Sequence, residues 1–142
     1  EELTTALRHL SGNTEIATQG EFDGWHRKTC EALCSAYAGA GYARFTVGQA
    51  QKWLNMALKY VFVFGETHLP GYASVYRFCH VPIDNILLDT PAFSGLNFFK
   101  ERWSRIVDYE DYLAFQIAVR ERFPEWAPLA VEFWAWQGRV AP

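Results

Sequence analysis

The chain has 142 residues, 50% of them hydrophobic and 17% aromatic, so it is long enough to bury a core and too apolar to remain disordered. Its net charge of −3 argues against a protein that coats nucleic acid non-specifically, although a local basic face is compatible with it, because binding depends on the few phosphates contacted. The three cysteines are too few for a disulfide scaffold or a four-cysteine iron–sulfur cluster, and we expect reduced thiols in a cytosolic protein.

The first half of the chain predicts three helices. Residues 3–10 carry apolar side chains at helical spacing, and residues 22–37 form a longer helical pattern that ends before a glycine-rich break. The strongest pattern covers residues 50–64, where two apolar faces leave little polar surface, so we expect a central helix that is buried on all sides. The second of these faces consists of Trp53, Ala57, Tyr60 and Phe64.

The second half of the chain predicts further helices and no strands. Pro82 favours an extended backbone before it, and Asp84 can cap a short helix that follows. An acidic start predicts a helix over 108–123, and a first-turn proline predicts another over 128–138. No apolar run reaches the length of a membrane span. We therefore expect one compact, soluble, all-α domain over residues 1–142.

Lys52 and Asp84 are the candidates for chemistry. Lys52 falls in the first turn of the helix expected over 50–64, where unsatisfied amides and the helix dipole disfavour an ammonium and favour the nucleophilic amine. Acidic residues are preferred at such a position, and broken local rules often mark functional sites. If the two helix starts face each other, Asp84 can orient the amine. The alternative is that Lys52 reaches solvent and Asp84 only caps its helix.

The run from Gly48 to Tyr60, followed by His80-Val81-Pro82-Ile83-Asp84, resembles the helix-hairpin-helix DNA glycosylase superfamily. The separation of 32 residues between lysine and aspartate is most similar to the archaeal 8-oxoguanine DNA glycosylase branch, which also places a Gln-Lys pair ahead of a buried helix. The resemblance covers residues 41–88 and implies a compact helical domain with a helix-hairpin-helix-like core. The glycine-rich hairpin of the family is reduced here, so Gly48 alone has to supply the turn and the amide contacts to phosphate.

The resemblance also implies roles for individual residues. Lys52 would attack C1′ of a flipped nucleotide and displace its base, and the resulting Schiff base could open by β-elimination; Asp84 would assist. Glu132 and Trp136, one turn apart, would line the base pocket, with the alternative of a core tryptophan beside a solvated glutamate. Gln51 and Trp53 flank the nucleophile and could touch the substrate, although Trp53 fits a core position equally well.

Basic and aromatic residues alternate over 97–105, which makes this segment the best candidate for contact with DNA, through Lys100, Arg102 and Arg105. Ordinary surface charges on a helix explain it equally well. His80 could hydrogen-bond near the site, but a lone histidine is more often structural. The other histidines share no metal-ligand spacing with one another or with the cysteines.

Three hypotheses follow. The first is a monomeric DNA glycosylase, with possible AP lyase activity, that needs no metal or cofactor and acts on double-stranded DNA in a prokaryotic cytoplasm. Its base would be 8-oxoguanine or a modified cytosine, the latter in phage DNA as part of antiviral defence. The second is a catalytically inert helical binding module, favoured by the acidic charge. The third is a defence-associated regulator that binds a protein through Phe133, Trp134 and Trp136.

Overall fold

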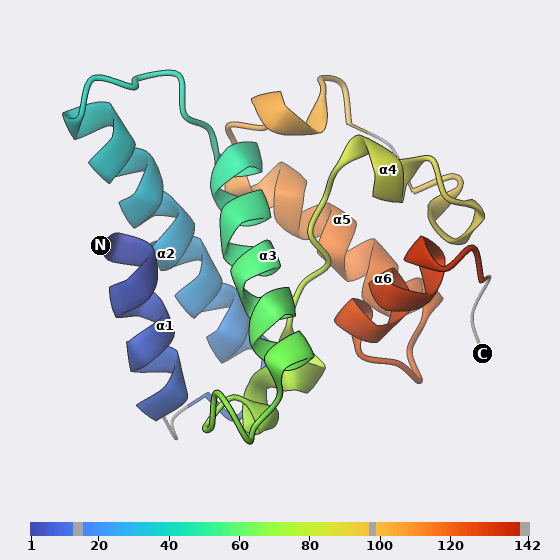
Figure 1. Ribbon diagram of the computed structural model, residues 1–142. Coiled ribbons are helices and arrows are strands. Elements are labelled where there is room, and N and C mark those ends of the chain that lie inside the picture. Colours follow the sequence, from blue (N-terminus) through green and yellow to red (C-terminus); the bar gives the residue numbers. More distant parts are fainter. Residues whose placement is uncertain (13–15, 97–98, 140–142) are drawn as a thin grey trace.

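The computed structural model describes residues 1–12, 16–96 and 99–139 (Figure 1). Within these ranges the chain forms helices and loops and contains no strand, which confirms the all-α prediction. The longer helices are α1 (Glu2–Gly12), α2 (Gln19–Gly39), α3 (Val47–Phe64), α5 (Tyr109–Arg122) and α6 (Pro128–Trp136). The shorter ones are α4 (Asn85–Leu88) and the 3-10 turns η1 (Ala73–Phe78), η2 (Pro91–Phe93) and η3 (Trp103–Arg105).

Two capping boxes start the long helices α2 and α3 earlier than expected. The Thr46 side chain accepts from the amide of Gln49, and the Gln49 side chain accepts from the amide of Thr46. Thr18 and Glu21 make the same exchange at the start of α2. Because α3 begins at Val47, Lys52 is the sixth residue of the helix and lies in its second turn. The expectation that Lys52 occupies the first turn is therefore wrong, and the charge of the helix end acts on it less directly.

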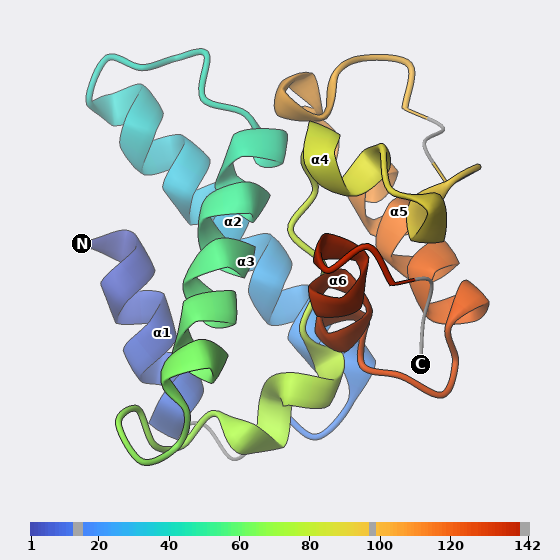
Figure 2. The ribbon, with the colours of Figure 1, turned by 45° about the vertical axis from the view of Figure 1, so that its right-hand side comes forward.

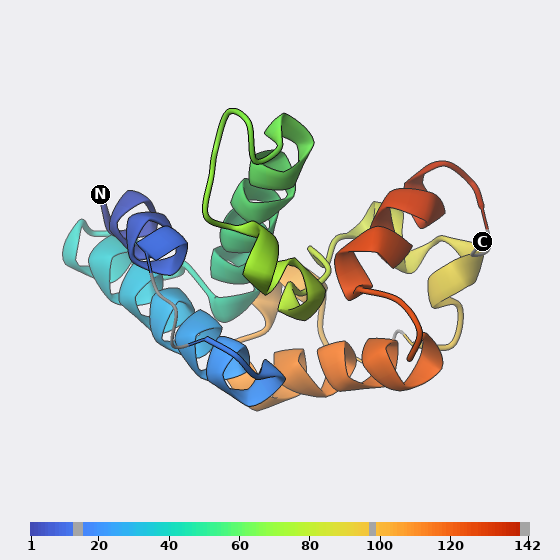
Figure 3. The same cartoon turned by 90° about the horizontal axis from the view of Figure 1, so that it is seen from below.

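Helix α3 runs through the middle of the molecule (Figures 1 and 2). On one side it packs against α2, which also contacts α1, and on the other side lie α4, α5 and α6. In the view from below, α5 runs along the base of the molecule while α3 and α6 rise above it (Figure 3). Helices α4 and α6 also contact each other. This arrangement brings the start of α4 and one face of α6 toward α3.

The core contains one face of α3 but not the other. Leu54 and Leu58 are completely buried, as expected for a central helix. Trp53, Tyr60 and Phe64 are exposed instead, because the neighbouring helices do not cover that side of α3. The expectation of a helix buried on all sides is wrong. The Trp53 ring packs edge-on against Tyr37 of α2 and Phe45 of the α2–α3 connection, and about half of the residue stays exposed to solvent.

The cysteines are packing residues in this fold. Cys30 and Cys79 are buried and Cys34 is half-buried, and all three are free thiols. Burial raises the pKa of each of the three thiols, so they stay protonated at neutral pH. Among the described residues, no group of three or more histidine, cysteine or acidic side chains is arranged to hold a metal ion. No helix in the described ranges is long and apolar enough to cross a membrane.

Candidate active site

Lys52 and Asp84 come together between α3 and the start of α4. The Lys52 amine donates to Oδ2 of Asp84 at 2.5 Å, and Oδ1 of Asp84 accepts from the amide of Leu87 at 2.7 Å. Asp84 therefore caps α4 and binds the lysine at the same time. The exposed fractions of the two side chains are 22% for Lys52 and 14% for Asp84, so the pair is mostly desolvated and still open to small groups from solvent.

A second lysine–carboxylate pair lies two turns further along the same face of α3. Lys59 donates to Oε1 of Glu132 on α6 at 2.7 Å. Only 1% of the Glu132 side chain is exposed, and its Oε2 has no hydrogen-bond partner among the described residues. Burial raises the pKa of Glu132, partly offset by the hydrogen bond and charge of Lys59. The charges of Lys52 and Asp84 also act on the Glu132 carboxyl, so the two pairs form one electrostatic neighbourhood.

Trp136 completes this neighbourhood from α6. The Lys59 ammonium lies 5.0 Å from the centre of the Trp136 ring and 4.9 Å from that of Phe133. Trp136 is 52% exposed. The alternative expectation was a core tryptophan beside a solvated glutamate. The structure shows the opposite arrangement, because Glu132 is buried and Trp136 is exposed to solvent. An aromatic face therefore stands next to a buried carboxylate, one turn away on the same helix.

Gln51 and Trp53 do not point into this space. Gln51 is completely buried, and its carboxamide is engaged with the backbone of Ile83. Trp53 is neither a core residue nor on the face of α3 that carries Lys52, because successive residues of a helix are about 100° apart around its axis. Neither of the side chains beside Lys52 therefore lies together with Glu132 and Trp136.

Gly48 has a different role from the one expected. Its amide donates to the carbonyl of Ile106 at 2.9 Å, so it is not free for a phosphate. A Cβ atom at this position would lie 1.9 Å from the carbonyl oxygen of Trp103. Glycine is therefore required for the close approach of η3, not for a turn with positive φ. Since Gly48 and Lys52 are one turn apart, η3 lies next to the Lys52 end of α3.

The basic residues expected to contact DNA lie on the surface near η3. Lys100, Arg102 and Arg105 are exposed, and Arg105 lies 3.7 Å from the Glu101 carboxylate. Asn97 and Phe98, which begin the candidate segment, fall outside the described residues.

The aromatic group expected to bind a protein partner lies near the C-terminal end. Phe133 and Trp134 are half-buried against the core, which leaves Trp136 as the exposed member of that group.

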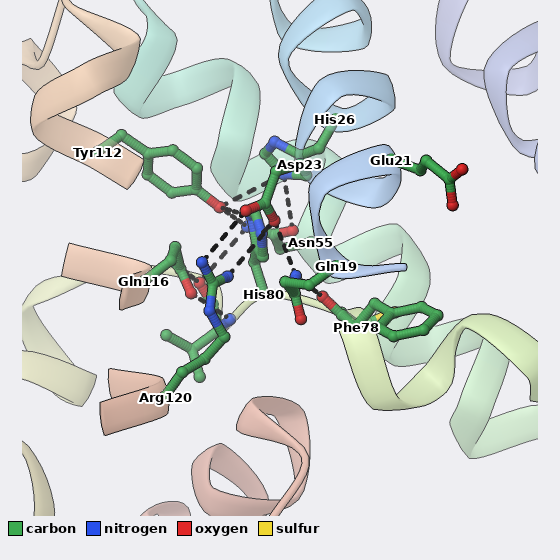
Figure 4. Close-up of polar contacts among 12 residues, drawn as sticks. Gln19, Glu21, Asp23, His26, Asn55, Phe78, His80, Tyr112, Gln116 and Arg120 are labelled. Atoms are coloured by element: carbon green, nitrogen blue, oxygen red, sulfur yellow. Dashed lines mark hydrogen bonds and ion pairs between the residues drawn. The ribbon is translucent and has the colours of Figure 1, made fainter. Parts of the chain in front are cut away.

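Sequence reasoning missed a buried polar network behind the pair, drawn in Figure 4. At its centre, the Asp23 carboxylate accepts from Nε2 of His80 at 2.7 Å, from Arg120 at 3.1 Å and from Gln19 at 2.7 Å. Burial by itself would raise the pKa of Asp23, but the hydrogen bonds from His80 and Gln19 and the charge of Arg120 hold it at about 2. His80 is therefore structural, the more frequent role for a lone histidine.

The network continues through Tyr112 and Asn55 to a second histidine. Tyr112 lies 2.8 Å from Nδ1 of His80 and accepts from the Asn55 carboxamide at 2.9 Å. Oδ1 of Asn55 lies 3.0 Å from Nε2 of His26, whose Nδ1 lies 2.8 Å from the Tyr109 hydroxyl. Burial lowers the pKa of both histidines, so each is neutral and donates through one nitrogen while accepting through the other.

One local signal could have revealed this network. His26 on α2, Asn55 on α3 and Gln116 on α5 are polar, yet each stands on a helix face that is otherwise apolar and buried. A buried polar group needs a hydrogen-bond partner, so such interruptions predict pairing across the core. The sequence pattern indicates which residues need partners, but it does not indicate which partners they find.

No protein-family model, curated protein or solved structure matches this chain.

Proposed function

We propose that the protein is a DNA glycosylase that uses Lys52 as its nucleophile. One observation carries the proposal: a partly exposed lysine amine lies 2.5 Å from a carboxylate supplied by a separate element 32 residues away. A nucleophilic amine needs a nearby base to remove its proton, and Asp84 has the distance and the geometry for it. In this proposal α2, the loop over 40–46 and α3 are the helix-hairpin-helix-like core.

The reaction follows from these two groups. Asp84 takes a proton from the Lys52 ammonium, and the free amine attacks C1′ of a nucleotide flipped out of the duplex. The bond between C1′ and the base breaks, and the base leaves with the electron pair and takes up a proton. The sugar ring then opens at O4′ to give a Schiff base between C1′ and Nζ of Lys52. Loss of a proton from C2′ expels the 3′-phosphate, which gives lyase activity on an abasic site.

Glu132 and Trp136 are the candidates for base recognition. The exposed Trp136 ring offers a face for stacking, and Oε2 of Glu132, which has no hydrogen-bond partner among the described residues, offers a buried acceptor for an N–H group of the base. Both 8-oxoguanine and a modified cytosine carry N–H donors, so repair and defence against phage DNA remain two versions of the proposal. We infer a monomer that binds double-stranded DNA in the cytoplasm without a metal or cofactor, with Lys100, Arg102 and Arg105 as phosphate contacts.

Covalent trapping tests the proposal. Duplex oligonucleotides that carry an abasic site, 8-oxoguanine or a modified cytosine are incubated with and without borohydride, using the wild type, Lys52→Ala and Lys28→Ala. Lys28 is an exposed lysine of α2 that lines a cavity beside α1, so it is a matched control. We expect an adduct with the wild type and Lys28→Ala and none with Lys52→Ala. Base release without an adduct would remove Lys52 as the nucleophile, and no release on any substrate would contradict the glycosylase.

A catalytically inert binding module is the second candidate. Two observations favour it. The Lys52 ammonium is already paired with the Asp84 carboxylate, and the Gly48 amide already donates a hydrogen bond to the carbonyl of Ile106. Such a module would bind duplex DNA or a protein partner and would give no adduct. The trapping experiment separates the two functions, because only a Schiff-base enzyme becomes covalently linked to DNA by borohydride.

A further inference from the structure

Two buried glutamines hold the extended segment that leads to Asp84. Gln51 donates from Nε2 to the carbonyl of Ile83 at 3.1 Å, and its Oε1 accepts from the amide of Ile83 at 3.2 Å. Gln116 does the same at Val81, with distances of 2.9 and 3.0 Å. Each carboxamide therefore bonds both the N–H and the C=O of one residue, as the backbone of a neighbouring β-strand does. The backbone between α3 and α5 is fixed at two points, on either side of a proline that has no amide hydrogen to satisfy.

The contact made by Gln51 links the two residues that matter for the chemistry. Gln51 directly precedes Lys52 in α3, and Ile83 directly precedes Asp84. One carboxamide therefore joins the immediate neighbours of the two catalytic groups, and a weaker contact from Asn55 to the carbonyl of Val81, at 3.4 Å, also ties α3 to this segment. Asn55 donates to Oε1 of Gln51 at 3.1 Å, which orients the carboxamide and connects it to the buried network.

We propose that Gln51 is a positioning residue that holds the Asp84 carboxylate against the Lys52 amine; this role rests on the proposed function of the pair. Gln51 is completely buried and has both polar atoms engaged, so it acts through the backbone and not on the substrate. Its loss would leave the buried amide of Ile83 without its partner, and the chain would shift to find another one. Catalytic groups must keep their geometry within about 0.5 Å, so a shift at residue 83 is felt at Asp84.

The first test compares Gln51→Met with Gln116→Met. Both changes remove a two-point contact to the same segment and keep a side chain of similar volume, so Gln116→Met is a matched control for lost stability. We expect Gln51→Met to slow single-turnover adduct formation by roughly 10- to 100-fold, as a displacement of about 1 Å does. Gln116→Met should lose much less rate at a comparable melting temperature. Gln51→Glu keeps the acceptor for the Ile83 amide and should fall between wild type and Gln51→Met. A rate that simply follows the melting temperature in all variants would overturn the proposal.

The second test does not depend on activity. A double-mutant cycle with Lys52→Met and Asp84→Asn measures the coupling energy of the pair by denaturant unfolding. We expect measurable coupling in the wild type and in the Gln116→Met background, and coupling near zero in the Gln51→Met background. Unchanged coupling in the Gln51→Met background, or no coupling in the wild type, would overturn the positioning role. If the coupling falls as expected but the wild type forms no adduct, the positioning role stands and the proposed function fails.

Discussion

Two polar regions on neighbouring faces of α3 are built in opposite ways. In the network around Asp23, the side chains of His80, Tyr112, Asn55 and His26 are completely buried, and each ring nitrogen has a partner. Asp23, at the edge of the network, is 15% exposed. The lysine face carries the partly exposed Lys52–Asp84 pair and the Lys59–Glu132 pair, in which Oε2 of Glu132 has no hydrogen-bond partner among the described residues. A saturated network has nothing left to offer a ligand and serves to fix the elements around it. An unsaturated one can still bind a ligand, so the proposed chemistry belongs to the lysine face and the scaffold role to the network.

The largest expected effect that tests this comparison is the loss of activity on substitution of Asp84. Asp84→Asn keeps a good helix cap but removes the base, so we expect single-turnover base release to fall by about 10²- to 10⁴-fold. The free energy of unfolding should change by only about 1 kcal/mol or less, because partly exposed ion pairs stabilise weakly. Quenched-flow cleavage assays and denaturant titrations measure the two quantities. Wild-type rates in Asp84→Asn would assign the carboxylate to capping alone.

The Lys59–Glu132 pair gives the next largest effect. Glu132→Leu alone leaves a lysine without its counter-ion against α6 and should cost roughly 3–5 kcal/mol of unfolding free energy. The double variant Lys59→Met/Glu132→Leu should be within about 1 kcal/mol of the wild type or more stable, since well-packed apolar groups can replace a buried pair. Equal losses in the single and double variants would show that the pair holds the fold together and is not kept for a ligand.

The saturated network should respond to a single apolar substitution by losing stability. Asn55→Leu keeps the volume but removes hydrogen bonds to His26, Tyr112 and Gln51, so we expect a loss of about 2–4 kcal/mol in unfolding free energy. Ser35→Ala, at an exposed position of α2, serves as the control and should change stability by only about 0.5 kcal/mol or less. A loss for Asn55→Leu no larger than that of the control would mean that the network does not fix the core.

The smallest effect is a dependence of stability on pH. Burial lowers the pKa of His26 and His80 below the ordinary histidine value of 6.5, so the unfolded chain binds protons first as the pH falls. The stabilisation is therefore present above pH 6.5 and is lost below it, by up to about 1.4 kcal/mol per pH unit for each proton. The pKa of Asp23 is also lowered, so its stabilisation is lost as the pH falls from the ordinary aspartate value of 3.8 to about 2. Glu132 has the opposite sign: its raised pKa offsets part of the loss as the carboxyl becomes protonated. Denaturant unfolding at pH 7.5, 6 and 5 measures the slope, and a flat profile would contradict neutral buried histidines.

The sequence by itself determined the helices and their ends. Asp84 caps α4 and Pro128 begins α6, as their positions predicted, and the acidic start expected for α5 is capped by Asp108. These signals act within a few residues, so they can be read locally. The capping box of Thr46 and Gln49 was equally local, and overlooking it placed Lys52 in the wrong turn. The pairing of Lys52 with Asp84 was expected only on condition that two helix starts face each other.

The tertiary structure alone decided which faces are covered and which distant polar groups meet. The periodicity of α3 made Trp53 and Tyr60 look like core residues, because a pattern shows where apolar side chains lie but not whether a neighbour covers them. The contacts of Gln51 with Ile83, and of Asp23 with His80, join residues 32 and 57 positions apart. No local preference encodes such pairs, since they follow from helix packing, which brings buried donors and acceptors within reach of one another.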